Sequence, residues 1–99
     1  MTRYKLTAQA ADDLAEIWDY VADDSPKAAN RVEAEILAAC DTIAEMPLTG
    51  RIRRDLTARP VRFWLVQPYR TYWIGYDCNT PLISIVRILQ ASRDISSIS

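Results

Sequence analysis

The chain has 99 residues, of which 49% are apolar and 25% are charged, with only two glycines and five prolines. This composition is typical of one globular domain, taken here as residues 1–99, and excludes a disordered chain. The sequence has no histidine, which excludes Ser-His-Asp and Cys-His catalysis and any zinc site with a histidine ligand.

The net charge of −1 is unevenly placed along the chain. Residues 1–50 contain four cations and ten acids, a balance of −6, whereas residues 51–99 contain eight arginines and three acids, a balance of +5. This asymmetry predicts an acidic partner for the second half. The alternative is that the two halves attract each other within the fold.

No apolar run approaches the ~20 residues that a membrane span needs. The opening stretch "MTRYKLTAQAADD" contains no apolar signal segment. We therefore expect a cytoplasmic protein with no membrane association. Cys40 and Cys78 are expected to be reduced apolar residues, and we expect no metal and no other cofactor.

The N-terminal half predicts a short strand and two helices. "RYKLT" alternates as a strand does, and apolar residues repeat at helical spacing from Ala8 to Asp23, including Trp18, which we expect in the core. Thr7 is the expected N-cap of this helix. Its acids are expected on a solvated face; they are Asp12, Asp13, Glu16, Asp19 and Asp23.

The second helix is expected to begin at Pro26, after the N-cap Ser25, and to run to about Met46. Pro47 and Gly50 in "MPLTG" are expected to end it. The connection between the two helices is very short, so we expect them to form an antiparallel hairpin.

The C-terminal half predicts a basic loop, Arg51–Pro60, followed by three strands. These are Val61–Val66, Thr71–Asp77 and Leu82–Leu89. Short turns join them, so they should run antiparallel. The expected fold is α+β with the order β-α-α-β-β-β, in which the helical hairpin packs on one face of an antiparallel sheet.

Neither face of this sheet is properly polar. In the last strand, strict alternation places Arg87 on one face with Ile83, Ile85 and Leu89. One helical hairpin covers only one face, so the other should leave aromatic and aliphatic surface, edged by arginine, in water. Such a surface predicts a bound partner chain.

Several stretches together resemble the RelE/ParE superfamily of bacterial toxins. They are the acidic helix "AADDLAEIWDYV", the helix end "EMPLTGRIRRDL", the strand pair "VRFWLVQPYRTYWIGYD" and the ending "ISIVRILQASRD". The last is similar to the ParE-type ending R-I-L-H-x-x-R-D. The resemblance covers nearly the whole chain and implies an α+β fold with a helical hairpin on a sheet.

The resemblance also implies a toxin of a type II toxin–antitoxin system. Such a toxin is neutralised by a cognate antitoxin, here ParD-like, in a hetero-oligomer that touches DNA only through the antitoxin. ParE-type toxins poison DNA gyrase by binding it, whereas RelE-type toxins cut mRNA in the ribosome. These are different classes of function, and the residues must decide between them.

Cutting RNA without a metal requires a base, an acid and cations for the phosphorane charge. Arg62, Arg70 and Arg87 offer charge, but arginine is a poor base. Gln90 stands where the superfamily ending has histidine, and the ending "DISSIS" has neither histidine nor tyrosine. The remaining candidates for proton transfer are expected to pack in the sheet; they are Tyr69, Tyr72 and Tyr76.

We therefore predict a ParE-like toxin that acts by binding and has no catalytic residues. The candidate contacts with antitoxin or target are Arg62, Trp64, Tyr69, Arg70, Arg87, Arg93 and Asp94. For Arg87 the alternative is an ion pair within the fold, for instance with Asp94, and for Arg93 and Asp94 it is a local pairing. The alternative functions are a RelE-like mRNA endonuclease and a protein that keeps the toxin fold without the toxicity.

Overall fold

The computed structural model describes residues 3–55, 57–66 and 72–90. Tyr69, Arg70, Arg93 and Asp94 lie outside these ranges. In chain order the described elements are β1 (Tyr4–Leu6), α1 (Ala8–Ala22), α2 (Pro26–Glu45), β2 (Arg51–Ile52), β3 (Arg62–Leu65), β4 (Tyr72–Asp77) and β5 (Ile83–Gln90).

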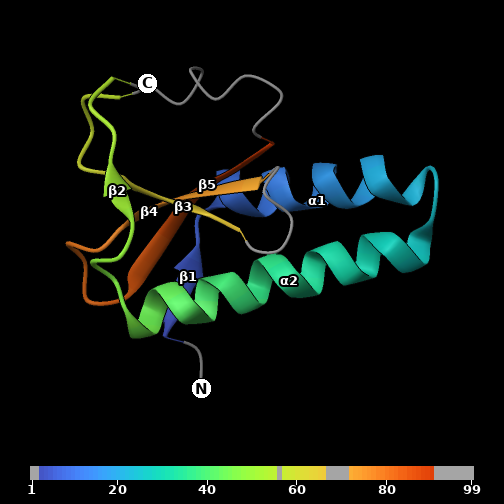
Figure 1. The fold of residues 1–99 in the computed structure, drawn as a ribbon, viewed down its shortest axis with the longest axis horizontal. Coiled ribbons are helices and arrows are strands. Elements are labelled where there is room, and N and C mark those ends of the chain that lie inside the picture. Colours follow the sequence, from blue (N-terminus) through green and yellow to red (C-terminus); the bar gives the residue numbers. More distant parts are fainter. Residues whose placement is uncertain (1–2, 56, 67–71, 91–99) are drawn as a thin grey trace.

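The two helices begin where their capping residues predict. The hydroxyl of Thr7 accepts a hydrogen bond from the Ala10 amide at 3.2 Å, and that of Ser25 accepts one from the Ala28 amide at 3.1 Å. Each bond satisfies one of the amides that a helix leaves without a partner in its first turn. Figure 1 shows α1 and α2 side by side as an antiparallel hairpin against the sheet.

The sheet has five strands in the order β1-β5-β4-β3-β2. The pairs β2–β3, β3–β4 and β4–β5 are antiparallel, but β1 runs parallel to β5. The α+β fold with its helical hairpin is thus confirmed, in a mixed sheet rather than a purely antiparallel one. The direction of β1 escaped prediction because the whole hairpin separates it from its partner, so no short turn fixes the pairing.

Apolar residues gather on both faces of the sheet. The helix-side cluster includes Leu14, Ile36, Ile43, Ile74, Tyr76 and Ile85. A smaller cluster contains Val61, Phe63 and Leu89, with Trp73 and Val86 packed against it. No side chain of the first three is more than 8% exposed. The expectation that this face leaves its aliphatic and aromatic residues in water is therefore wrong for Val61, Phe63 and Leu89, whereas Trp73 and Val86 are half-buried.

A β-bulge changes the faces of β5. Gly75 of β4 pairs with Arg87, but the next residue, Tyr76, pairs with Ile85, so β5 has one extra residue at this point. Beyond the bulge Ile88 joins Ile85 in the helix-side cluster, whereas Leu89 joins the second cluster. The expected face shared by Ile85, Arg87 and Leu89 is therefore wrong, because strict alternation holds only without an extra residue.

Among the residues that the structure describes, no helix combines the length and the apolar character that a membrane crossing requires.

Candidate functional site

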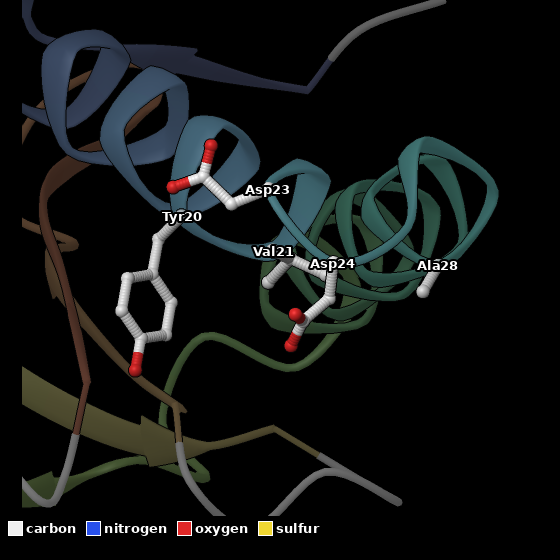
Figure 2. Close-up of a pocket in the computed structure, with 5 residues that line it drawn as sticks. All are labelled: Tyr20, Val21, Asp23, Asp24 and Ala28. Atoms are coloured by element: carbon white, nitrogen blue, oxygen red, sulfur yellow. The ribbon is translucent and has the colours of Figure 1, made fainter.

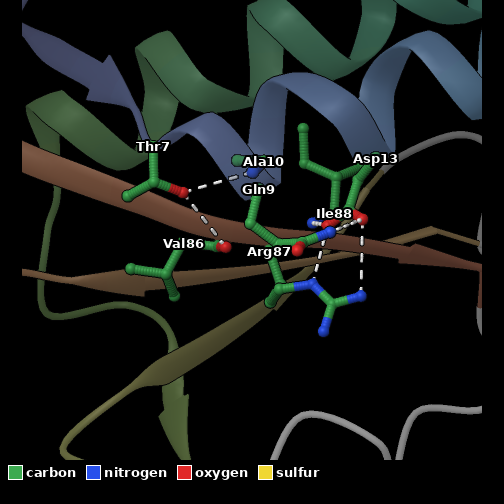
Figure 3. Close-up of polar contacts among 7 residues, drawn as sticks. All are labelled: Thr7, Gln9, Ala10, Asp13, Val86, Arg87 and Ile88. Atoms are coloured by element: carbon green, nitrogen blue, oxygen red, sulfur yellow. Dashed lines mark hydrogen bonds and ion pairs between the residues drawn. The ribbon is translucent and has the colours of Figure 1, made fainter.

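Asp13 is a buried carboxylate on the inner side of α1, with only 6% of its surface exposed. It accepts hydrogen bonds from Arg87 Nε at 2.8 Å, from Arg87 Nη2 at 3.3 Å and from the Ile88 amide at 3.0 Å. Gln9, one turn earlier on α1, adds a bond of 3.0 Å from its side-chain amide. Figure 3 shows these groups converging between α1 and β5.

Arg87 therefore forms an ion pair within the fold, with Asp13 as the acid, while its contact with a partner chain stays a prediction. The Arg87 side chain is 22% exposed, so this is a mostly desolvated pair. Charges at such depth are tolerated when they are paired and their remaining hydrogen-bonding capacity is satisfied, as it is here by the Ile88 amide and Gln9.

Asp13 also corrects the expectation that all the acids of α1 are solvated. A signal for this was present in the sequence: Ala10, Asp13, Leu14 and Ile17 follow the spacing of a buried helical stripe. All four are buried in the structure. An acid in such a stripe predicts a buried partner, but the sequence does not name the cation that supplies it.

The start of α1 also covers the edge of β5. Strand β1 pairs with β5 only as far as Leu6. Beyond it, the Thr7 amide donates to the Ile85 carbonyl at 3.0 Å, the Thr7 hydroxyl donates to the Val86 carbonyl at 3.3 Å, and Asp13 accepts the Ile88 amide. These contacts satisfy backbone groups that an open strand edge would expose.

A second polar node joins the end of α2 to the sheet. The buried hydroxyl of Tyr76 donates to the Pro47 carbonyl and accepts from the Gly50 amide, both at 2.8 Å. Arg62 donates to the Gly50 carbonyl at 2.8 Å and to the Leu48 carbonyl at 3.4 Å. Burial raises the pKa of Tyr76 above its ordinary value, which keeps the hydroxyl a proton donor.

Gly50 has a different role from the one that the sequence predicts. Helix α2 ends at Glu45 with Met46 as its C-cap, so Gly50 lies four residues beyond that cap. A Cβ atom at Gly50 would lie 2.3 Å from the hydroxyl oxygen of Tyr76 and 2.8 Å from its ring. Glycine is required here because a buried tyrosine closely approaches the backbone.

The chain that follows Gly50 presents basic side chains. Arg51, Arg54 and Arg59 are exposed. Arg53 forms an ion pair with Asp55, with bonds of 2.9 and 2.6 Å. Part of the expected loop is strand β2, which pairs with β3 at the sheet edge. We call residues 46–54 the basic segment; it also contains exposed apolar residues.

The structure separates the other candidate residues. Trp64 is half-buried and packs against the helix-side core. Tyr72 and Tyr76, considered for proton transfer, are both buried members of that core, which agrees with the expected packing role. Trp18, expected in the core, is half-buried, and its indole N–H donates to Asn30 of α2 at 3.0 Å.

Neither cysteine is in a disulfide. Burial, and secondarily the charge of Asp41, raises the pKa of the Cys40 thiol to about 12. This thiol is therefore protonated near neutral pH and is a poor nucleophile. It fits the apolar role that the sequence predicts.

A hollow of about 430 Å³ lies at the α1–α2 turn. Figure 2 shows its lining residues: Tyr20, Val21, Asp23, Asp24 and Ala28. In the view of Figure 1 this turn lies at the opposite end of the molecule from β2. None of its described lining residues is a predicted contact residue.

Comparison with known proteins assigns the chain to a family. Residues 4–95 match the family model described as the ParE toxin of the type II toxin–antitoxin system parDE. The chain belongs to the ParE toxin family. This membership makes it the toxin component of a type II toxin–antitoxin system of the ParE/RelE kind, and it implies an antitoxin as partner.

Two relatives of this ParE-family toxin agree with the assignment. It is 37% identical over 93 residues to "Toxin RelE2" of Caulobacter vibrioides (strain ATCC 19089 / CIP 103742 / CB 15), which covers 94% of this chain and 99% of that protein. It also resembles a chain of the "Chromosomal ParDE TA system from P. aeruginosa", with a TM-score of 0.74 and 24% identity over 91% of this chain and 96% of that one. The second likeness shows the shared fold.

Proposed function

We propose that this ParE-family toxin inhibits DNA gyrase by binding it, and that it is not an RNA-cutting enzyme. The observation that carries the proposal is the Asp13–Arg87 pair. A nuclease that works without a metal must place a free cation beside the phosphorane. Here the guanidinium of Arg87 binds a buried carboxylate with two hydrogen bonds, which neutralises its charge and fixes its orientation.

Two tyrosines of the sheet that were considered for proton transfer, Tyr72 and Tyr76, add support. A general acid or base must reach the reacting proton. Tyr76 is fully buried, and its hydroxyl is used by Pro47 and Gly50. Tyr72 is only 6% exposed within the core. Together with Gln90 in place of histidine, these positions favour binding over proton transfer.

The proposed partners follow from the family. A cognate ParD-like antitoxin would neutralise this toxin in the cytoplasm as a hetero-oligomer, with operator DNA contacted only by the antitoxin. DNA gyrase would be the target when the antitoxin is lost. Arg62 is one of the residues predicted to make these contacts. Its described partners are neutral carbonyl groups, so none of them offsets its positive charge.

The second candidate is a ribosome-dependent mRNA endonuclease. Two observations favour it: the relative that shares 37% of its residues is named Toxin RelE2, and the exposed arginines of the basic segment suit contact with RNA phosphates. A third candidate is a chain that keeps the fold and the antitoxin without toxicity. Both are outcomes of the test below.

Induced expression in cells without the antitoxin distinguishes the three candidates. Gyrase poisoning should produce broken DNA, an SOS response and filamentous cells while translation initially continues. Prompt arrest of translation with cleaved mRNA would instead establish the nuclease. Normal growth despite soluble, folded toxin would establish the third candidate. Co-expression of the gene next to this one should restore growth in the first two cases.

A further inference from the structure

Exposed apolar side chains concentrate in the basic segment. Five large apolar residues of the described chain are exposed: Tyr20, Met46, Leu48, Ile52 and Leu82. Three of the five fall between residues 46 and 52, and Leu48 has the largest exposed fraction at 70%. Apolar surface gathered in one short segment marks a site of contact with another protein.

The same segment is strongly basic. Residues 46–54 contain three arginines and no acid, and the wider stretch 51–62 contains five arginines and a single acid, Asp55. Asp55 pairs with Arg53, while Arg51 and Arg54 extend into solvent. Arg62 binds only neutral carbonyls among its described contacts, so the node at Gly50 adds to the positive charge instead of cancelling it. The partner that complements this surface is therefore acidic.

The segment is also held in place before any partner arrives. The hydroxyl of Tyr76 binds both ends of the turn, at Pro47 and at Gly50, and Arg62 binds the carbonyls of Leu48 and Gly50. Ile52 pairs with Arg62 in the ladder between β2 and β3. A surface that is ordered in the free protein loses little conformational entropy on binding, so its contacts contribute more of their energy to affinity.

These three features point to one occupant. Arginines alone would suit a nucleic acid, but exposed leucine, isoleucine and methionine side chains gain little from phosphates and much from apolar side chains. We propose that residues 46–54 are the docking surface for an acidic polypeptide segment with apolar side chains, and that this segment belongs to the cognate antitoxin. The inference rests on family membership and is independent of gyrase as the target.

The test uses the double variant Leu48→Ser/Arg54→Glu, which changes one exposed apolar and one exposed cationic side chain of the surface. We expect it to bind the full-length antitoxin encoded beside this gene at least about tenfold more weakly than wild type in calorimetric titration. The difference should shrink as salt is raised, because screening weakens the contribution of Arg54 in the wild type.

The matched control is Leu82→Ser/Lys27→Glu, which makes the same two kinds of change outside the segment. It should bind within about threefold of wild type, and both variants should melt like wild type because all four sites are exposed. Equal antitoxin affinity of wild type and the Leu48/Arg54 variant would overturn the proposal, and so would an equal loss in the control. A third outcome would assign the surface to nucleic acid. In that case the Leu48/Arg54 variant would bind random duplex DNA more weakly than wild type but would bind the antitoxin with unchanged affinity.

This result is separate from the question of target. A variant that loses the antitoxin but still inhibits gyrase supports both proposals. A toxin that never inhibits gyrase but loses the antitoxin through the Leu48/Arg54 substitutions refutes the proposed target alone.

Discussion

Arg62 in β3 and Arg87 in β5 belong to the same sheet, but their guanidinium groups meet different partners. Arg87 binds the buried carboxylate of Asp13 from α1, so its charge is neutralised inside the fold. Arg62 binds the carbonyls of Leu48 and Gly50, which orient the guanidinium without cancelling its charge. The first arginine joins α1 to the sheet, whereas the second preserves a positive surface beyond the C-terminal end of α2.

The difference between the two arginines indicates which of them can contribute to the binding of an anionic partner. An arginine already paired with a buried acid gains little from a new anionic partner, because that pair must first be broken. An arginine held by neutral groups still attracts an anion. The positive charge of the described chain is therefore concentrated at β2 and β3, beside the exposed apolar residues of the basic segment.

The largest expected effect comes from Asp13→Ala. This change leaves Arg87 half-buried without its carboxylate and the Ile88 amide without its acceptor, and should cost about 3 kcal/mol of the free energy of unfolding. Denaturant unfolding measures it, with Asp12→Ala, an exposed neighbour on α1, as the control within about 0.5 kcal/mol. If the Asp13 and Asp12 variants were equally stable, the Asp13–Arg87 pair would not be a structural contact, and Arg87 would not differ from Arg62 in this respect.

Gly50→Ala should have the next largest effect. The added Cβ would lie 2.3 Å from the Tyr76 hydroxyl, so the turn must shift and both tyrosine bonds weaken, at a cost of about 2 kcal/mol. Combined with Tyr76→Phe, the alanine should cost less than it does alone, because the hydroxyl is gone. A double-mutant cycle measures this coupling, and strict additivity would contradict the proposed contact.

Arg62→Ala should destabilise the fold less than Asp13→Ala, by about 1 kcal/mol. It removes hydrogen bonds to two carbonyls at a partly exposed site and leaves no buried charge behind. The same unfolding assay measures the change. A cost as large as that of Asp13→Ala would mean that the Arg62 node is as structural as the Asp13–Arg87 pair.

The smallest effect concerns alkaline pH. Burial raises the pKa of Tyr76 above its ordinary value of 10.0, so its stabilising contribution is complete below pH 10 and is lost as pH rises through the higher folded-state pKa. Tyr76→Phe should therefore show a shallower fall in stability above pH 10 than wild type, in unfolding measured across that range. Since Cys40 titrates there in both proteins, only the difference between the two profiles counts. Parallel profiles would place the hydroxyl outside the buried node.

Features set by local chemistry were predictable from the sequence. The caps at Thr7 and Ser25 and the helical hairpin depend on neighbouring residues or on helical spacing. Three features were not predictable in this way. The pairing of Asp13 with Arg87 joins residues far apart in the chain, the bulge in β5 depends on its pairing with β4, and Gly50 is explained only by Tyr76. Each depends on tertiary contacts that no local pattern encodes.

The candidate site likewise has features that were predictable from the sequence and features that depend on tertiary contacts. The sequence identified the residue types for partner contact, arginines and aromatics of the sheet, but not which charges would remain available. Arg87, one of the predicted contact residues, has its charge paired with Asp13 inside the fold. The exposure of Leu48 and Ile52 was not predictable, because nothing in their sequence context distinguishes an exposed apolar residue from a buried one.

The most direct measurement adds the purified toxin to two reactions. One contains DNA gyrase with relaxed plasmid, and the other contains ribosomes translating a defined mRNA. We predict that the toxin blocks supercoiling and produces cleaved plasmid, that adding the antitoxin reverses the block, and that the mRNA stays intact. Cleavage of the ribosome-bound mRNA with undiminished supercoiling would contradict the account.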